Sequence, residues 1–546
     1  MKFLLTSISS EVSTMAFPLG VSILKTTLDN EFPKELLETK IIQFYLSESS
    51  EKNILDQILS AEPDAIGLSI YIWNRSEIVT LTKELKRLRP EIILIGGGAE
   101  ATANPGSLMK DSVLDYIILG DGEVVLPGVT GSILKGEDPG PKAGLISRKT
   151  SSLNTVPVYN TRPGETPSSF LSKTLDIGLF PGILWETSRG CPYNCSFCYE
   201  SKGRDKTATY PYDRLAGELQ FFSENDICQI FVLDPSFNSN KKHALKILEL
   251  IKEHCPEIQF TFEIKGEELD EELARSFGEI NCYLQIGLQS SNPTALKNVN
   301  RFFNEKKFTA GCNSLHNNGV PFGLDLIYGI PGDSYTYFLK SMDFALSQKP
   351  QNLDIFPLAV LPGTPLAERA EEFGMDYNRK SPYLIIALPG FPEEDIALAE
   401  VLTESADAFL SGGETQYWFT TIVKASGLTP SDFLSGYYEW IKKSENNDFK
   451  PEKLREQYTE KTLLSTGNKA AIKAAMSLMR LYGAINDILE GSDTAIAEIY
   501  FNPDDLENAE MVNLSDFSTY FDERLQYWLV YQEEGELLFA EIVKPT

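Results

Sequence analysis

The sequence is poor in basic charge, in long apolar runs and in histidine, and each shortage excludes a class of protein or site. Its 546 residues include 49 Lys and Arg against 78 Asp and Glu, which gives a formal net charge of −29. Nucleic acids and anionic membrane surfaces attract basic proteins, so we expect neither as a partner. No stretch approaches the roughly 18 consecutive apolar residues that predict a transmembrane helix. Only three histidines occur, and none precedes His243.

Cysteine is also scarce. The chain has seven cysteines, an odd number, and four of them stand singly, at Cys228, Cys255, Cys282 and Cys312. That pattern is unlike the disulfide framework of a secreted protein. Residues 1–17 lack both an apolar h-region and a small-residue cleavage site, so they predict a strand rather than a signal peptide. We therefore expect a cytoplasmic protein whose four single cysteines are buried as small apolar side chains.

Short runs of branched apolar residues alternate with helical patterns in the N-terminal third. Runs that are apolar throughout are typical of strands buried on both faces of a parallel sheet. Repeated β–α units of this kind predict an α/β fold, here a doubly wound, Rossmann-like domain over residues 1–135. Ligands of such sheets lie beyond the carboxyl ends of the strands. The expected strands are 2–8, 40–46, 64–72, 91–98 and 115–123.

The same alternation returns after a connector rich in Pro, Gly, Ser and Thr at residues 136–181. Six further β–α units predict a partial (β/α)6 barrel over residues 182–385, with its active face at the carboxyl ends of the strands. Beyond it, amphipathic helical patterns and a terminal hairpin predict a separate, mainly helical domain over residues 386–546. The expected barrel strands are 183–189, 228–237, 258–265, 282–290, 322–332 and 353–363.

Three of the seven cysteines stand together in the stretch CPYNCSFC, as Cys191, Cys195 and Cys198. They follow the first barrel strand, on the side where the active face is expected. A closed zinc site usually needs four ligands, and no fourth cysteine or histidine lies near this stretch. Three thiolates suit a [4Fe–4S] cluster, because soft sulfur selects such clusters and one iron then stays open for a small molecule. Zinc and three unrelated thiols are the alternatives.

The stretch CPYNCSFC resembles the C-x3-C-x-Φ-C signature of the radical S-adenosylmethionine (SAM) superfamily, with Phe197 in the aromatic position. The resemblance implies that the amino and carboxylate groups of SAM chelate the open iron and that Phe197 helps to hold the adenine. An electron from the cluster would then cleave the sulfonium and release a 5′-deoxyadenosyl radical. Asp234 and Asn238 stand where this superfamily often binds the methionine amino group.

Two later segments resemble the same superfamily. IGLQSSNPTALKNVNR resembles its fourth-strand segment, which implies ribose or carboxylate contacts for Gln289, Ser290 and Arg301. DLIYGIPGDS resembles the fifth-strand segment that lies against the adenine, which implies a contact from Ile330. An ordinary hydrogen bond at a strand end is the alternative for each polar residue.

A doubly wound domain directly before such a barrel resembles the cobalamin-binding class of the superfamily, in a branch with an added C-terminal domain. This resemblance covers about residues 1–385 and implies cobalamin as a cofactor. A domain that has lost the cofactor and only packs against the barrel is the alternative. The implied cobalamin-binding residues, all near strand ends, are Ser69, Tyr71, Trp73, Gly96, Gly97, Gly98 and Glu123.

The N-terminal domain has no histidine that could ligate cobalt. Tyr71 and Trp73 are candidates to lie under the corrin instead, and aromatic core packing is the competing interpretation. Glycines after a strand let a large group approach the backbone, but a tight turn explains the triplet from Gly96 to Gly98 about as well.

The resemblance implies an enzyme that methylates an unactivated carbon, because the class pairs a substrate radical with methylcobalamin. A cobalamin-assisted rearrangement and radical chemistry without cobalamin are the alternatives among enzymes. An iron–sulfur electron-transfer or sensing module is the alternative of another class. We expect a small-molecule or peptide substrate and an electron donor such as a flavodoxin or ferredoxin. No pattern in the sequence identifies the substrate or the catalytic residues.

Overall fold

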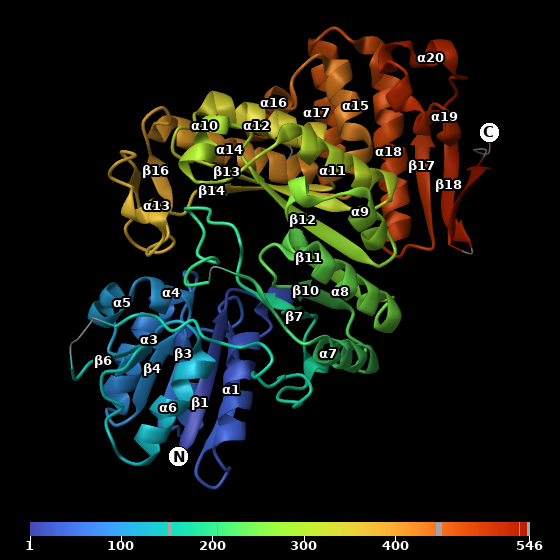
Figure 1. Ribbon diagram of the computed structural model, residues 1–546. Coiled ribbons are helices and arrows are strands. Elements are labelled where there is room, and N and C mark those ends of the chain that lie inside the picture. Colours follow the sequence, from blue (N-terminus) through green and yellow to red (C-terminus); the bar gives the residue numbers. More distant parts are fainter. Residues whose placement is uncertain (151–154, 205, 444–449, 534, 543–546) are drawn as a thin grey trace. The chain divides into compact units, whose positions relative to one another are not determined.

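The computed structural model describes residues 1–150, 155–204, 206–443, 450–533 and 535–542 (Figure 1). Parts of the predicted domains therefore lie outside the described residues: 151–154 of the connector, 205 of the barrel, and 444–449, 534 and 543–546 of the C-terminal domain. The chain divides into two compact units. The first contains residues 1–285, 297–320 and 358–388, and the second contains residues 286–296, 321–357 and 389–546.

The first unit opens with a six-stranded sheet in the order β2-β1-β3-β4-β5-β6. All five predicted N-terminal strands are present and parallel, and β1 pairs with β2 from Lys2 opposite Glu38 to Ser9 opposite Tyr45. The sixth strand lies in the predicted connector and runs antiparallel to β5. The strands are β1 (Lys2–Ser9), β2 (Glu38–Tyr45), β3 (Ala65–Ser69), β4 (Ile93–Gly97), β5 (Tyr116–Ile118) and β6 (Leu145–Ser147).

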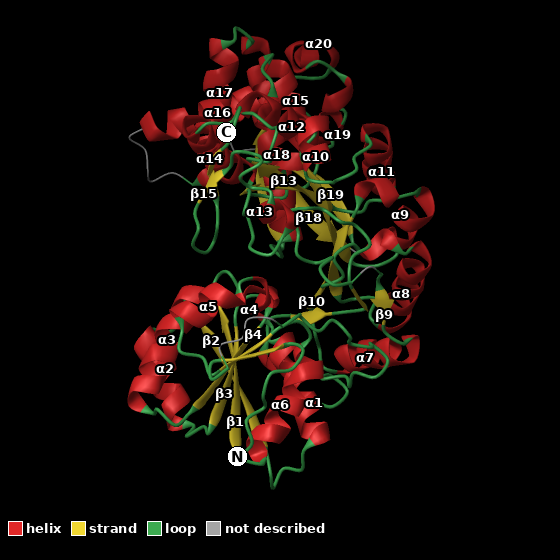
Figure 2. Cartoon of the chain, turned by 60° about the vertical axis from the view of Figure 1, so that its left-hand side comes forward, coloured by secondary structure: helices red, strands yellow, loops and turns green. Residues whose placement is uncertain are grey.

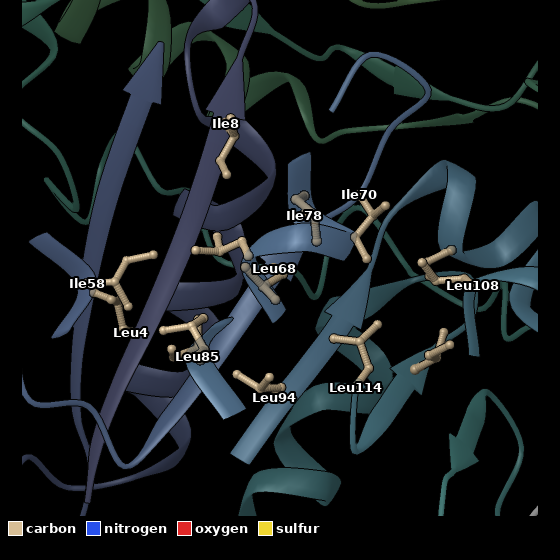
Figure 3. Close-up of a cluster of buried hydrophobic side chains, with 14 of the residues drawn as sticks. Leu4, Ile8, Ile58, Leu68, Ile70, Ile78, Leu85, Leu94, Leu108 and Leu114 are labelled. Atoms are coloured by element: carbon tan, nitrogen blue, oxygen red, sulfur yellow. The ribbon is translucent and has the colours of Figure 1, made fainter. Parts of the chain in front are cut away.

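Helices cover both faces of this sheet, as the prediction of a doubly wound domain requires (Figure 2). Alternate strand residues point to opposite faces, so each face has its own core. On one face, Leu4, Leu68 and Leu94 of the strands pack with apolar residues of four helices (Figure 3). Those helices are α2 (Glu51–Ser60), α3 (Arg75–Leu88), α4 (Ala99–Ala103) and α5 (Pro105–Asp111). The other face is covered by α1 (Leu19–Glu31) and α6 (Gly122–Leu134).

A second six-stranded sheet follows, and all six predicted barrel strands are present. Its order is β7-β10-β11-β12 in the first unit and β12-β13-β14 in the second, because β12 begins in one unit and ends in the other. The pairs β7–β10, β10–β11 and β13–β14 are parallel. The strands are β7 (Ile183–Trp185), β10 (Gln229–Val232), β11 (Gln259–Ile264), β12 (Cys282–Gln289), β13 (Phe322–Tyr328) and β14 (Asn352–Pro357).

A helix follows almost every strand of this second sheet, which confirms the predicted β–α alternation. The three histidines fall in helices, as the pattern predicts, with His243 and His254 in α8 and His316 in α11. These helices are α7 (Tyr212–Glu224), α8 (Lys241–His254), α9 (Glu271–Gly278), α10 (Pro293–Asn298), α11 (Glu305–Asn317) and α12 (Tyr335–Ser347).

The second unit ends in a mainly helical region, in agreement with the predicted fold class. Thr429 caps α16 (Pro430–Lys443), because its Oγ1 accepts a hydrogen bond of 3.1 Å from Asp432 N. The terminal hairpin β18–β19 forms, and β17 adds a third antiparallel strand. The main elements are α14 (Glu393–Leu410), α15 (Thr415–Ser426), α16 (Pro430–Lys443), α17 (Pro451–Ser465), α18 (Ile472–Leu489), β17 (Thr494–Ile499), β18 (Gln526–Glu533) and β19 (Glu536–Ile542).

No helix within the described ranges combines the length and the apolar character needed to cross a bilayer.

Candidate functional site

The three clustered cysteines lie on one loop, residues 190–200, here called the cluster loop, which follows the short strand β8 (Ser188–Arg189). Cys191, Cys195 and Cys198 are all partly buried free thiols. Backbone hydrogen bonds fix the loop to distant parts of the same unit. Ser196 N donates to Val299 O, and Ser196 O accepts from Leu366 N, both at 2.9 Å.

Burial disfavours the thiolate form of two of the three cluster-loop cysteines, Cys191 and Cys198. Burial raises the pKa of Cys198 to about 12 and also raises the pKa of Cys191. A bound metal ion displaces the proton and holds the sulfur as a thiolate. Two donors already face these sulfurs: Glu200 N donates to Cys198 Sγ at 3.4 Å, and Arg301 Nη1 lies 4.0 Å from Cys195 Sγ. Such donors stabilise the negative charge of a thiolate.

The donor set fits a cluster better than a single ion. Within the part of the chain that the structure describes, no three His, Cys, Asp or Glu side chains gather as they would around one metal ion. In an iron–sulfur cluster, by contrast, thiolates bind the irons of an extended inorganic core. Three free cysteines on an anchored loop are compatible with that arrangement.

A buried carboxylate supports the strand that leads into the cluster loop. Asp234 is 1% exposed. It accepts hydrogen bonds from the backbone N–H groups of Thr187 (2.8 Å) and Ser188 (3.1 Å) and from their hydroxyls (2.6 and 2.5 Å). Burial raises the pKa of Asp234 to about 6, although these hydrogen bonds act in the opposite direction. A carboxylate has about four acceptor positions, so Asp234 is occupied by the protein rather than placed to bind a SAM amino group.

The second residue expected near the SAM amino group is occupied as well. The side-chain amide of Asn238 exchanges two hydrogen bonds of 2.9 Å with the backbone N and O of Lys265. Its function in the fold is therefore to fix the end of β11.

The predicted SAM-binding residues fall in both units. Phe197 lies on the cluster loop and Arg301 beside Cys195, in the first unit. Gln289, at the end of β12 with a left-handed φ of 69°, belongs to the second unit with Ser290 and Ile330.

Ser290 and Ile330 are almost completely buried in the second unit, at 1% and 0% exposed. The Ser290 hydroxyl lies 3.5 Å from Asp333 Oδ2 and 3.3 Å from Ser341 Oγ, and it accepts from Asn292 N at 3.0 Å. Hydrogen bonds at a strand end, the alternative for this residue, are therefore present.

A cavity of about 230 Å³ lies at the carboxyl ends of the N-terminal strands. It is here called the glycine-walled cavity. Six of the seven predicted cobalamin-binding residues line it: Ser69, Tyr71, Gly96, Gly97, Gly98 and Glu123. Trp73 is not among the lining residues; it is 51% exposed, and its ring stacks on that of Tyr71 with centroids 4.4 Å apart.

The glycines of the cavity wall differ in the structural reason for the missing side chain. A Cβ at Gly98, where φ is 107°, would lie 2.7 Å from Ile70 O, so this glycine serves the tight turn. A Cβ at Gly96 would come within 2.7 Å of Leu114. At Gly97 and Gly20, which line the cavity, a Cβ would meet nothing closer than 3.9 and 3.8 Å, which are ordinary van der Waals distances. The tight turn therefore explains Gly98, whereas the role of Gly97 as a close approach for a ligand stays a prediction.

The cavity fits one part of a cobalamin. Glycines and apolar side chains form much of its wall, with the charged side chains of Asp121, Glu123 and Arg189 beside them. Glycine in such a wall admits a large group close to the backbone. Its volume is below the range of about 300–1,000 Å³ usual for small-ligand pockets, so a whole corrin cofactor would extend beyond it. No histidine lies in this domain to ligate cobalt.

Two ion pairs join residues that flank the cluster loop to acidic residues that line the cavity, and neither pair was predicted from the sequence. Arg189, two residues before Cys191, lines the cavity and pairs with Glu123 at its rim and with Glu186 at 2.7 Å. Arg204 pairs with Asp121, another lining residue. All these side chains are mostly buried. Their partners lie about 66 and 83 positions away in sequence, so no local pattern could have shown the pairing.

One expectation about the other cysteines is wrong. Cys255, Cys282 and Cys312 are buried as predicted, but Cys228 is exposed. It immediately precedes β10, at the edge of the predicted strand.

Comparisons with known proteins agree with this architecture. Residues 185–345 match the radical SAM superfamily, and residues 6–130 match the B12 binding domain. The cobalamin-dependent radical SAM methyltransferase TokK of Streptomyces tokunonensis is 24% identical over 374 residues, which cover 63% of this chain and 54% of TokK. The chain thus spans about half the length of that relative. The uncharacterized methyltransferase PH0819 of Pyrococcus horikoshii is 25% identical over 67% of this chain and 81% of that protein.

A solved structure shows the same fold over most of the chain. The cobalamin-dependent S-adenosylmethionine radical enzyme OxsB, with aqua-cobalamin bound, superposes with a TM-score of 0.61 at 14% identity, over 95% of this chain and 84% of that one. A radical SAM domain implies a [4Fe–4S] cluster and SAM, and a B12-binding domain implies cobalamin. The cluster loop and the glycine-walled cavity are thus the expected sites of a chain that combines a B12-binding domain with a domain of the radical SAM superfamily.

Proposed function

We propose that this chain is a cobalamin-dependent radical SAM methyltransferase of the cytoplasm, which methylates an unactivated carbon of a small-molecule or peptide substrate. The observation that carries the proposal is that the cluster loop and the glycine-walled cavity belong to one compact unit. The Arg189–Glu123 and Arg204–Asp121 ion pairs join the residues on either side of that loop to the cavity. The similarity to TokK, a cobalamin-dependent radical SAM methyltransferase, supports the same chemistry.

The proposal assigns a role to each predicted site. When bound, the cluster supplies the electron that cleaves SAM, and cobalamin carries the methyl group. Cys191, Cys195 and Cys198 would hold the cluster. The adenosyl and methionine groups of SAM would contact Phe197, Gln289, Ser290, Arg301 and Ile330. Cobalamin would contact the residues of the glycine-walled cavity, with Tyr71 and Trp73 near its lower face.

The protein's own groups prepare these sites. Arg189 holds the cluster loop to the rim of the cavity, and the Thr187–Asp234 hydrogen bonds fix the strand before it. We propose domain limits of 1–135, 136–181, 182–385 and 386–546. A flavodoxin or ferredoxin would deliver the electrons.

Anaerobic reconstitution tests the proposal. The protein is supplied with iron, sulfide, cobalamin, a reductant and methyl-labelled SAM, and we measure iron content, the visible spectrum and 5′-deoxyadenosine. The wild type should bind about four irons per chain, show corrin absorbance and form 5′-deoxyadenosine. Cys195→Ala should lose the cluster and all SAM cleavage, whereas Cys228→Ala, which removes an exposed thiol of the same unit, should behave as wild type.

Three results would contradict the proposal in different ways. Zinc in place of iron removes the radical chemistry altogether. Iron without SAM cleavage, after a screen of substrates, favours an electron-transfer or sensing protein. Deoxyadenosine without transfer of label to any product rules out the methyltransferase and favours another radical reaction.

A further inference from the structure

Residues 358–388, here called the return segment, belong to the first compact unit, although the strand before them, β14, belongs to the second. The segment contains the short helix α13 (Pro365–Glu368) and a hairpin of β15 (Asp376–Tyr377) and β16 (Ile385–Ala387). Its contacts run both to the cluster loop and to the N-terminal domain, so one continuous piece of chain connects the two predicted cofactor sites.

The first half of the return segment packs against the cluster loop. Leu366 N donates to Ser196 O at 2.9 Å, and the Leu366 side chain is completely buried. Gly363 has a left-handed φ of 74° and fills a narrow gap. A Cβ at this glycine would lie 3.4 Å from the ring of Tyr199 in the cluster loop and 3.2 Å from Ala103 O of α4. The segment therefore touches the cluster loop and the N-terminal domain at one point.

The second half of the return segment is bonded to the turn that follows β3, residues 71–74, here called the aromatic turn. Ser381 Oγ donates to Ile72 O, the carbonyl between the stacked side chains of Tyr71 and Trp73. Those two rings are the ones predicted to lie under the corrin. The hydrogen bond from Ser381 therefore holds the backbone that carries them.

A second hydrogen bond from the return segment reaches a buried carboxylate. Tyr383 OH donates to Glu100 Oε1, and both residues are 2% exposed. Arg75 Nε lies 2.9 Å from the same oxygen, and Glu100 N donates at 3.2 Å to Ile70 O, directly before the aromatic turn. Burial raises the pKa of Tyr383 to about 12, so its hydroxyl keeps the proton that it donates. Hydrogen bonds to a charged group are stronger than those between neutral groups.

The backbone at Tyr383 is strained. Its φ of 61° is left-handed, which is unfavourable for a residue other than glycine. Strained conformations persist only where neighbouring contacts maintain them, and they are frequent at functional sites. Here Tyr383 O accepts from Val360 N at 2.9 Å, and Ile385 N donates to Leu358 O at 2.9 Å. The residues that follow β14 thus hold Tyr383 in the conformation in which its hydroxyl meets Glu100.

We infer that the return segment sets the distance between the cluster loop and the aromatic turn, with Tyr383 as the positioning residue. This inference rests on the proposed function, in which the cluster and cobalamin act on one substrate. Two groups that act in sequence on one substrate must be fixed relative to each other, because a displacement of about 1 Å can lower a rate by about 100-fold. Tyr383 would act through Glu100 and the aromatic turn rather than by touching a cofactor.

The test uses the full chain with single substitutions in the return segment. Tyr383→Phe removes only the hydroxyl that reaches Glu100, and Ser381→Ala removes the hydrogen bond to the aromatic turn. Tyr377→Phe is the matched control. It removes a tyrosine hydroxyl from the same segment, but that hydroxyl accepts from Arg379 at 2.5 Å in an exposed position.

Two measurements follow the aromatic turn. In the protein without metal and cobalamin, hydrogen exchange is recorded at residues 71–74 and in α4. In the protein reconstituted with both cofactors, pulsed electron paramagnetic resonance gives the distribution of distances between the reduced cluster and cob(II)alamin. Iron content, corrin absorbance and melting temperature are measured for every variant.

Tyr383→Phe should speed hydrogen exchange in the aromatic turn and in α4 by about 10-fold or more, because it removes a hydrogen bond to a charged group. It should also broaden the distribution of cluster-to-cobalt distances. Iron and corrin contents should stay as in wild type, because the residues predicted to hold the cofactors are unchanged. Ser381→Ala should speed exchange in the aromatic turn alone, and Tyr377→Phe should match wild type in every measurement.

An unchanged distance distribution in Tyr383→Phe overturns the inference, whatever its exchange rates. Faster exchange throughout the first unit, or a loss of iron or corrin, also overturns it, because Tyr383 would then support the fold as a whole. In these cases wild type still binds both cofactors, so the proposed function stands. A wild type that binds neither cluster nor cobalamin refutes the proposed function and the positioning role with it.

Discussion

The cluster loop and the glycine-walled cavity belong to one compact unit but are built in different ways. The loop is held by polar groups: backbone hydrogen bonds to Val299 and Leu366, the carboxylate of Asp234 below it, and ion pairs beside it. The cavity is shaped by the lack of side chains at Gly20 and Gly97 and by apolar neighbours. A site for a metal cluster thus needs positioned donors, whereas a site for a bulky cofactor needs space.

This difference between the two sites predicts how substitutions in each will change stability and cofactor binding. Removing a polar group below the cluster loop should cost stability and metal binding together, because buried donors lose their partners. Filling space in the cavity should remove the cofactor and spare the fold, because no protein atom is displaced.

The largest effect is expected from Asp234→Ala. It leaves the N–H groups of Thr187 and Ser188 without acceptors in a buried position, which should lower the free energy of unfolding by about 3 kcal/mol or more. Iron content after reconstitution should fall as well. Chemical unfolding of the metal-free protein measures the change in the free energy of unfolding. Asp234→Asn, which keeps one acceptor oxygen, should lose less stability than Asp234→Ala. A variant as stable as wild type would show that the carboxylate does not support the loop.

A pH dependence is expected from the same network. His243, 2% exposed, lies 3.0 Å from Thr187 Oγ1 through its Nε2, and burial lowers its pKa from 6.5 to about 4. The unfolded chain therefore takes up this proton first as the pH falls. The contribution of neutral His243 is full above about pH 6.5 and is lost as the pH falls towards 4.

Replacement of His243 by Gln should reduce the loss of stability between pH 7 and pH 4.5 by about 2–3 kcal/mol. Urea unfolding at pH 7 and pH 4.5 measures this loss of stability in the wild type and in the variant. The raised pKa of Asp234 changes the stability in the opposite direction, because the native carboxyl group takes up a proton before the unfolded one as the pH falls through about 6. An unchanged pH dependence in His243→Gln would show that this histidine is not held neutral by the fold.

The smallest effects on stability are expected in the cavity wall, where two neighbouring glycines form a matched pair. Gly97→Leu should weaken cobalamin binding by about 10-fold or more with little change in melting temperature, because Gly97 lines the cavity and an added Cβ makes no contact shorter than 3.9 Å. Gly98→Ala should instead destabilise the protein by about 1–3 kcal/mol. The backbone at Gly98 has a φ of 107°, and the added Cβ would lie 2.7 Å from Ile70 O. Calorimetry measures the stability of the two variants, and corrin absorbance measures their cobalamin content. A stable Gly97→Leu variant with normal cobalamin content would refute the assignment of the cavity to cobalamin.

Much of the fold was accessible from the sequence. Eleven predicted strands occur, because continuous apolar runs and helical spacing are local properties. The edge strand β6 was missed, since it lies in a segment rich in turn residues and pairs with only three residues of β5. The exposed Cys228 was also missed, because a single cysteine does not reveal on which side of a strand boundary it lies.

The candidate site was accessible in part. The spacing of Cys191, Cys195 and Cys198 and the strand ends at Ser69 and Gly97 follow from local order along the chain. The hydrogen-bond partners of Asp234 and Ser290 could not be predicted from local order, because these hydrogen bonds join residues about 46 and 43 positions apart.

By itself, the sequence determined the alternation of strands and helices, the thiol triplet and the absence of a histidine before His243, since each depends on neighbours along the chain. Only the tertiary structure decided which glycines leave room in the cavity wall, which arginines beside the cluster loop pair with residues of that cavity, and that the carboxyl group of Asp234 is buried. Those properties depend on distances between residues that are far apart in the chain, and burial changes the energy of a charge in a way that no local pattern records.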